Sequence, residues 1–477
     1  MTAKVDLKIN NEVRKMLMIA VDVGTTNSKV LVVDQMGKVR AKAENGYHLI
    51  SRAPGQAEED PELIWQAIKK GLSEVAGAVD EEATLCFSTA MHSLLAINQN
   101  KAISPLFTWA DTRSARYATE NLKAFALASG VPLHPMIPLV KLAWLKAENK
   151  PLYEKAEKWL DLKSFLMSKF TGEYVTDYAC AGSFGLLDCQ SMHWNRDAMN
   201  ELGLSNDRLP RIVATKTIFP IVNKKLLKEL GLNIKQLVIG ASDGTLSNLA
   251  QEESDHSFSI TIGTSAAVRG AIDHLALDPQ NCLFTYRLDN KQWVMGAPSN
   301  NGGNILAWWQ KIWNVSYEQI GDSLTEALIG ADGVRFYPYL YGERAPLWDA
   351  NVTGKMLGLS ANITQSEMIR GVVEGMLFNI RSNYDLLVKI LPKPYQINLS
   401  GGVCRLNGLP QMLADIIGLP VKVASQADSS ATGAAMLAYA ALGVTMPLNL
   451  GESQLYLPNK TAHELYELVY RDWLTKR

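Results

Sequence analysis

The first strongly apolar part of the chain begins at residue 17, where apolar runs alternate with short polar turns. Residues 17–23 and 30–33 are almost entirely apolar, and residues 38–47 alternate between apolar and polar positions. Apolar runs of this length between turn residues are typical of β-strands. The pattern predicts three consecutive antiparallel strands. A helix should follow them, because Asp60 and Pro61 form a common helix start.

The strand, turn, strand pattern returns in FSITIGTSAAVRGAI, residues 258–272. Its Gly263 occupies the position that Gly24 occupies in the first copy, MIAVDVGTTNSKVLVVD. The chain therefore carries two copies of one structural unit. A glycine, a hydroxyl residue and a second strand follow the first strand in both copies.

Helices and strands alternate in the rest of the second half. Thr364 and Glu367 fit a capping box at the start of a long helix with apolar residues at helical spacing. A strand is predicted at residues 397–399, with helices at 409–417 and 430–442. Alternating strands and helices place the chain in the α/β fold class.

The length of 477 residues is too great for one hydrophobic core. We expect two domains, at residues 17–250 and 251–477, with the boundary in the polar stretch near residues 250–256. Clefts between domains are common small-molecule sites. Residues 1–16 are polar, and we expect them to form a flexible extension.

Composition excludes several classes of partner. The 47 basic and 48 acidic residues give a net charge of −1, which argues against a nucleic-acid partner. The five cysteines are scattered without CxxC spacing, so neither a disulfide framework nor a zinc site is indicated. No segment resembles a signal peptide or a bilayer span. We expect a soluble, cytoplasmic protein without a membrane partner.

The first turn carries candidate phosphate chemistry. The turn at Gly24 exposes backbone amides to an anion, Thr25 and Thr26 add hydroxyl donors, and Lys29 adds a positive charge. Asp22 beside such a turn suits a divalent cation such as Mg²⁺, which binds carboxylate and phosphate oxygens together. The alternative is that these residues only stabilise a tight turn.

Two later glycine turns extend this prediction. Gly263 and Thr264 would form a second phosphate turn across the cleft, and Gly401 with Gly402 follows a predicted strand. Two facing turns can bind a polyphosphate, and a glycine pair leaves room for a purine. The alternative for the glycine pair is close packing within the fold.

Asp243 lies between Ser242 and Gly244, after an apolar strand and near the junction of the two halves. A carboxylate beside Mg²⁺ and a substrate hydroxyl can take the proton as the oxygen attacks a γ-phosphoryl group. Asp243 is therefore a candidate general base. The alternative is an aspartate that caps a helix.

The order DxGTTxSK, an aspartate loop, GTS and SGG resembles the actin, hexokinase and heat-shock-chaperone superfamily. Within it, residues 17–450 are similar to the FGGY carbohydrate kinases. MIPLVKLAWLKAE resembles the first signature of that family and departs from it at Ala147. GKMLGLSANITQSEMIRGVVE resembles the second signature and departs from it at Gly371. Neither departure concerns a reacting group.

This resemblance implies two ribonuclease-H-like domains that close on a sugar and MgATP. It also implies that Asp243 is the base, that Asp22 binds magnesium through water with Asp243 nearby, and that Gly303, Gly401 and Gly402 line the nucleotide. A homodimer is expected on the same ground. A nucleotide-gated chaperone module on the same scaffold is the alternative of a different class.

Two loops of the first half, which we expect to face the substrate, combine an aromatic side chain with polar and charged side chains. Aspartate and arginine suit polyol hydroxyls, and tryptophan suits apolar C–H faces; the candidates are Met91, His92, Trp109, Asp111 and Arg113. The alternatives are that Asp111 and Arg113 pair only with each other, that Trp109 is core, and that His92 is a satisfied buried histidine.

These loops, with NNGGN around Asn301 and GERAPLW around Arg344, look most like those of the gluconate kinases of the FGGY family. For an open-chain sugar acid, a cationic His92 and Arg113 would face the carboxylate, with Arg344 as another partner. The alternative substrate is xylulose or a related pentulose, phosphorylated by the same chemistry.

Overall fold

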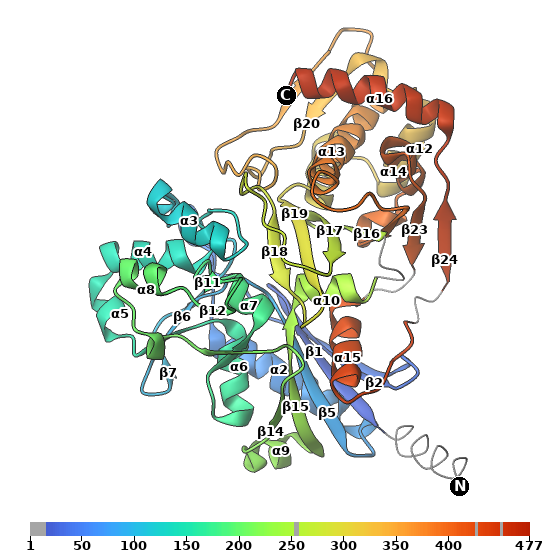
Figure 1. The fold of residues 1–477 in the computed structure, drawn as a ribbon. Coiled ribbons are helices and arrows are strands. Elements are labelled where there is room, and N and C mark those ends of the chain that lie inside the picture. Colours follow the sequence, from blue (N-terminus) through green and yellow to red (C-terminus); the bar gives the residue numbers. More distant parts are fainter. Residues whose placement is uncertain (1–15, 252–256, 425–427, 449–451) are drawn as a thin grey trace.

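The computed structural model describes residues 16–251, 257–424, 428–448 and 452–477. Two lobes, each built on its own β-sheet, make up the chain (Figure 1). The expected extension at residues 1–16 and the expected boundary at residues 250–256 lie outside the described residues, apart from residues 16, 250 and 251. Helices and strands are mixed in both lobes, as the α/β prediction requires.

The first lobe contains a six-stranded sheet with the order β14-β15-β5-β1-β2-β3. β1, β2 and β3 pair antiparallel, which confirms the three predicted strands. β5 runs parallel to both β1 and β15, so the carboxyl ends of these three strands lie at one edge. The strands are β1 (Leu17–Val23), β2 (Asn27–Asp34), β3 (Val39–Gly46), β5 (Ala83–Thr89), β14 (Ile218–Pro220) and β15 (Ile234–Ser242).

The second lobe contains a seven-stranded sheet with the order β18-β19-β17-β16-β22-β23-β24. Its hairpin β16-β17 has a parallel neighbour, β22, just as the hairpin β1-β2 has β5. The predicted repeat is therefore present in three dimensions. The strands are β16 (Ser257–Ile262), β17 (Ala266–Ile272), β18 (Phe284–Arg287), β19 (Trp293–Ser299), β22 (Gln396–Ser400), β23 (Val421–Ala424) and β24 (Ser453–Tyr456).

Within the residues that the structure describes, short strands form five small additional sheets. These are β4 (Glu58–Glu59) with β8 (Leu106–Phe107), β7 (Lys101–Ala102) with β6 (Leu95–Asn98) and β9 (Lys158–Leu160), β10 (Val175–Asp177) with β13 (Arg211–Val213), β11 (Leu187–Asp188) with β12 (His193–Trp194), and β20 (Arg335–Tyr337) with β21 (Lys355–Leu357).

The two helix starts predicted from capping residues are confirmed. Asp60 accepts a hydrogen bond from the Glu62 amide at the start of α2, and Thr364 with Glu367 forms the capping box of α13. The helices are α2 (Pro61–Val75), α3 (Glu120–Ala128), α4 (Pro138–Glu148), α5 (Lys150–Lys155), α6 (Leu162–Thr171), α7 (Tyr178–Gly182), α8 (Arg196–Leu202), α9 (Lys224–Leu230), α10 (Asp243–Leu249), α11 (Gly303–Trp313), α12 (Tyr317–Glu326), α13 (Gln365–Leu387), α14 (Leu409–Ile417), α15 (Ser429–Ala441) and α16 (Lys460–Thr475).

Helix α15 packs on the first lobe although it follows the second sheet in sequence. It lies against β1, β5 and α10 (Figure 1). Gly433 permits this approach, because a Cβ atom there would lie 2.0 Å from the carbonyl oxygen of Leu246. Helix α15 therefore joins the two lobes, because it comes from the second half of the chain and packs on the first sheet.

All five cysteines have free thiols. Within the described ranges, no helix combines the length and the apolar character that crossing a bilayer requires.

Candidate functional site

A cavity of about 250 Å³ lies between the lobes and is lined from both. The first turn contributes Thr25 and the second contributes Ser265, so the two turns meet at one site. Sequence-predicted residues that line the cavity are Thr25, Met91, His92, Trp109, Asp243 and Arg344. Met136, Arg269, Phe284 and Tyr286 also line it, and the sequence did not identify the last three as site residues.

Asp22 lies at the carboxyl end of β1, where its Oδ1 accepts a hydrogen bond of 2.7 Å from the Ser88 hydroxyl on β5. Burial raises the pKa of the Asp22 carboxyl to about 7, and the nearby charge of Asp243 adds to the rise. Two largely buried carboxylates that repel each other gain from a shared cation. In the described part of the chain, no three His, Cys, Asp or Glu side chains gather as a metal site.

Asp243 is the first residue of α10, directly after β15. Its Oδ1 accepts a hydrogen bond of 2.7 Å from the Gly244 amide. Burial raises the pKa of the Asp243 carboxyl, while the Gly244 bond and the charges of Arg269 and Lys163 oppose that rise. A carboxylate made more basic by burial, with one edge toward a cavity, is suited to accept a proton from a hydroxyl.

In both glycine turns the glycine amide donates a hydrogen bond within its own turn. The Gly24 amide donates to the Asn27 carbonyl at 3.0 Å, and the Gly263 amide donates to the Ser265 carbonyl at 2.9 Å. Both glycine amides therefore have partners within their turns. The prediction that these two amides donate to a phosphate is corrected, because their hydrogen atoms are already used. Thr26 and Thr264 are exposed beside them and keep their hydroxyls available.

Trp109 connects the first turn to an arginine of the second lobe. Its Nε1 donates to the Thr25 hydroxyl at 3.1 Å, and the Arg344 guanidinium carbon lies 4.9 Å from its ring centroid. The indole therefore faces the cavity between two polar groups and is not a simple core residue. Such a ring suits the apolar C–H face of a sugar.

Two largely buried arginines, Arg269 and Arg344, line the same cavity. Burial lowers the pKa of Arg344 to about 10 and also lowers that of Arg269, yet both stay charged at neutral pH. Nε of each is buried and has no hydrogen-bond partner among the described residues. Buried donors without partners are costly, so an anionic ligand would satisfy them.

Arg269 was not among the residues predicted from the sequence, although the strand pattern carries a signal for it. Alternate residues of a strand point to one face. Ser265, Ala267 and Arg269 all line the cavity, so the face that begins in the second turn continues along β17 to the arginine.

His92 lines the cavity as a neutral ring. Its Nδ1 lies 2.9 Å from the Ser183 carbonyl, so this nitrogen carries the proton, and its Nε2 accepts from the Tyr286 hydroxyl at 3.2 Å. Burial lowers the pKa of His92 to about 3. The expected cationic His92 is therefore wrong, because both ring nitrogens are satisfied in the neutral form and burial disfavours the charge.

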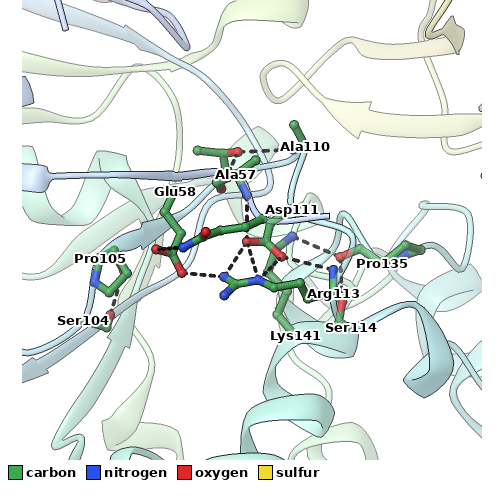
Figure 2. A network of polar contacts seen from close by, with 12 residues as sticks. Ala57, Glu58, Ser104, Pro105, Ala110, Asp111, Arg113, Ser114, Pro135 and Lys141 are labelled. Atoms are coloured by element: carbon green, nitrogen blue, oxygen red, sulfur yellow. Dashed lines mark hydrogen bonds and ion pairs between the residues drawn. The ribbon is translucent and has the colours of Figure 1, made fainter. Parts of the chain in front are cut away.

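Asp111 and Arg113 form an ion-pair network away from the cavity lining. Nη2 of Arg113 lies 2.6 Å from Oδ2 of Asp111 and 2.5 Å from Oε1 of Glu58. Figure 2 shows the guanidinium between the two carboxylates. Asp111 is fully buried and also accepts from the Ala57 amide at 3.1 Å. The predicted contacts of these two residues with substrate are corrected, because their charges are already paired within the first lobe.

Asn301 and Lys29 also have protein partners. The Asn301 amide donates to the Gly342 carbonyl at 2.8 Å and to Glu343 at 3.1 Å, and its side chain is fully buried outside the cavity lining. This corrects its predicted substrate contact, since it supports the loop that carries Arg344. Lys29 pairs with Asp428 at 3.1 Å, beside the first turn.

The three other glycines differ in their surroundings. A Cβ at Gly303 would lie 2.7 Å from the Gly263 carbonyl oxygen, and one at Gly401, where φ is +105°, would lie 2.2 Å from the Ile262 oxygen. Both positions therefore need glycine for close packing. A Cβ at Gly402 would meet nothing within 4 Å, so this residue borders open space.

Comparison with protein families gives two matches along the chain. Residues 17–250 match the N-terminal domain of the FGGY family of carbohydrate kinases. Residues 258–442 match the C-terminal domain of the same family.

Individual relatives cover most of the chain. It is 34% identical over 449 residues to the gluconokinase of Bacillus subtilis (strain 168), covering 89% of this chain and 88% of that protein. It is 27% identical to the xylulose kinase of Staphylococcus xylosus, covering 88% of this chain and 90% of that protein. Two crystal structures from Lactobacillus acidophilus are each 30% identical: a ligand-bound xylulose kinase with a TM-score of 0.93 (97% and 98% covered) and a gluconate kinase with a TM-score of 0.91 (97% of both chains).

Proposed function

Because the chain belongs to the FGGY family of carbohydrate kinases, we propose that it transfers the γ-phosphoryl group of ATP to the C6 hydroxyl of D-gluconate. The family and the two-domain fold predicted from the sequence are thereby confirmed, and the chaperone alternative falls away. The choice of gluconate rests mainly on one observation, the two largely buried arginines in the cavity.

The charge of the cavity supports a sugar acid. Arg269 and Arg344 carry positive charges, His92 is neutral, and Asp243 is the one acidic side chain among the described residues that line the cavity. Burial of a cation is costly unless an opposite charge accompanies it. Asp243 near Arg269 and Glu343 near Arg344 supply part of that charge. The carboxylate of gluconate would add to it and bond to the guanidinium groups, whereas a neutral pentulose would not. The gluconokinase of B. subtilis is a relative at 34% identity.

In this proposal, Asp243 accepts the proton of the C6 hydroxyl as its oxygen attacks the γ-phosphorus. The new P–O bond forms as the bond to the β,γ-bridging oxygen breaks, so ADP leaves and the proton remains on the Asp243 carboxylate. Trp109 and Met91 would orient the carbon chain, and a closed cavity excludes water that would otherwise compete for the phosphoryl group.

The residues present fit MgATP. Asp22 and Asp243 are largely buried carboxylates with raised pKa values, which a cation between them would lower. Mg²⁺ bound through few carboxylates, phosphate oxygens and water matches this donor set. When bound, the ion would neutralise charge on the phosphates. Thr25, Thr26, Lys29 and Thr264 would contact the β- and γ-phosphates, and Gly402 would border the nucleotide.

A coupled assay of ADP release with D-gluconate, D-xylulose and D-glucitol tests the substrate. D-Glucitol differs from gluconate only in carrying an alcohol in place of the carboxylate, so it isolates the charge. We expect kcat/KM for gluconate to exceed that for the two neutral compounds by at least about 100-fold. Faster turnover of xylulose would replace the substrate and leave the kinase chemistry intact.

The variants Arg269→Met and Arg344→Met separate two roles of the arginines. If they bind the substrate carboxylate, each should lower kcat/KM for gluconate by about tenfold or more and leave that for D-glucitol within about twofold. Equal losses with both compounds would instead assign the arginines to the phosphates. The predicted homodimer and cytoplasmic location stay predictions.

A further inference from the structure

The strand that ends at Asp243 is irregular just before it. The register of β15 against β5 shifts between Val238 and Ala241, so β15 has one residue more than β5 over this stretch. Gly240 within it has a φ of +79°, and a Cβ there would lie 1.8 Å from the Phe87 carbonyl oxygen. A bulge of this kind bends the strand and changes the direction of the next side chains.

A buried lysine from α6 satisfies the carbonyl groups of this bulge. Nζ of Lys163 donates to the carbonyl oxygens of Ile239 at 3.0 Å, Ala241 at 3.1 Å and Phe87 at 3.3 Å. Buried carbonyl groups that lose their strand partners need another donor. One ammonium group therefore ties β5 to β15 two residues before Asp243.

The same ammonium forms an ion pair with Asp177. The Lys163 to Asp177 distance is 3.0 Å, and both side chains are fully buried. Oδ1 of Asp177 caps α7 by accepting from two of its first amides. At the other end of α7, Ser183 bonds to the amide of His92 through its hydroxyl and to Nδ1 through its carbonyl. The ion pair thus connects the elements that carry Asp243 and His92.

A third branch of the contacts leads to Asp22. Phe87, whose carbonyl accepts from Lys163, precedes Ser88, and Ser88 donates to Asp22. No atom of Lys163 lines the cavity described above. Its contacts are with the backbone and with Asp177, so it acts on the site through other residues.

We propose that Lys163, paired with Asp177, is a positioning residue that fixes Asp243 and His92 in their productive orientation. The inference rests on the proposed function, because it needs Asp243 as the general base. A pair that served folding alone would change stability without changing the properties of the folded enzyme.

The test compares Lys163→Met and Asp177→Asn with a matched control, Arg370→Met. Arg370 forms a buried ion pair with Glu374 at 2.8 Å on α13 of the second lobe, away from the cavity lining. All three variants should unfold at lower temperature. We expect Lys163→Met to lower kcat with gluconate at least about tenfold while KM for ATP stays within about threefold. Arg370→Met should keep the kcat of the wild type per folded molecule.

Asp177→Asn keeps an acceptor oxygen for α7 and replaces the oxygen that faces Lys163 with an amide donor, so it breaks the ion pair together with its hydrogen bond. It provides the test if Lys163→Met does not fold. Its kcat should fall at least about fivefold, again with KM for ATP nearly unchanged. A folded Lys163→Met or Asp177→Asn enzyme with kcat within about twofold of wild type would overturn the inference, as would an equal loss in Arg370→Met.

Asp243→Asn, measured in parallel, separates a failure of the proposed function from a failure of the positioning role of Lys163. Normal turnover of Asp243→Asn would remove the proposed base and the function built on it. An inactive Asp243→Asn beside a fully active Lys163→Met would reject the positioning role alone.

Discussion

Lys29, which follows the first glycine turn, and Asp428, at the start of α15, form an ion pair of 3.1 Å although they come from opposite ends of the chain. Lys42 on β3 also contacts Asp428, at 2.6 Å. If Lys29 turned toward a phosphate, Asp428 would still be paired with Lys42. Lys29 can therefore be tested for a role in nucleotide binding, with Lys42 as its comparison.

Lys29→Met should raise KM for ATP by about tenfold, because a charge-assisted contact to phosphate is lost. Lys42→Met is the matched control, since it removes a contact to the same aspartate from a strand outside the turn, and its KM should stay within about twofold. Both changes should cost about 1 kcal/mol of stability or less, as the lysines are partly exposed. Equal KM values in the two variants would exclude Lys29 from the phosphate site.

Gly402→Val should weaken ATP binding without unfolding the protein. A Cβ at Gly402 meets nothing within 4 Å, whereas one at Gly401 would lie 2.2 Å from the Ile262 oxygen. We expect KM for ATP to rise at least about fivefold in Gly402→Val. Gly401→Ala should lose about 2 kcal/mol of stability or more through steric strain. Unchanged ATP kinetics in Gly402→Val would show that the nucleotide lies elsewhere.

Glu59→Gln should make stability less dependent on pH. Glu59 is only 3% exposed, its Oε1 has no partner among the described residues, and burial raises its pKa to about 8. Between pH 4.5, the ordinary value, and pH 8, the folded protein binds a proton that the unfolded chain releases. The free energy of unfolding therefore falls as pH rises, by up to about 1.4 kcal/mol per unit.

The free energy of unfolding of Glu59→Gln should not fall in this way. Urea titrations from about pH 5 to about pH 8.5 should therefore show the stability of the variant rising relative to that of the wild type as pH rises. Parallel stability curves for the two proteins would contradict the assignment of a raised pKa to Glu59.

Asp243→Ala should retain ATP binding and lose phosphoryl transfer by about 10²-fold or more. The reason is that the carboxylate acts on the substrate hydroxyl rather than on the nucleotide. Calorimetric titration with ATP checks the first part, and single-turnover kinetics with gluconate check the second. A variant that phosphorylates gluconate at a near-normal rate would exclude the residue as the base.

The local elements were accessible from the sequence. The three antiparallel strands, the caps at Asp60 and Thr364, and the helix ending before Gly418 all occur as expected. Each depends on residues that are near one another in the chain, so a pattern of apolar spacing and turn residues is enough to find it. The repeated glycine turn also predicted that two related lobes meet at one site.

The charge states and ion-pair partners of the site residues were harder to predict from the sequence. The sequence predicts that a cationic His92 and Arg113 face the substrate, but burial lowers the pKa of His92 to about 3 and Arg113 pairs with Asp111 and Glu58. Arg269 was not predicted, because the sequence does not show that the strand face it shares with Ser265 borders the cavity.

The sequence by itself determined the family, the α/β class, the strands that open each half of the chain, and the two glycine turns with Asp22 and Asp243 in or near them. Only the tertiary structure decided that α15 packs on the first lobe and that Arg269 and Arg344 share a cavity. It also decided that Lys163 donates to the Ala241 carbonyl, two residues before Asp243. The physical reason is that the burial of a charge, and the partner that satisfies it, depend on segments far apart in the chain. Local patterns carry no information about those partners.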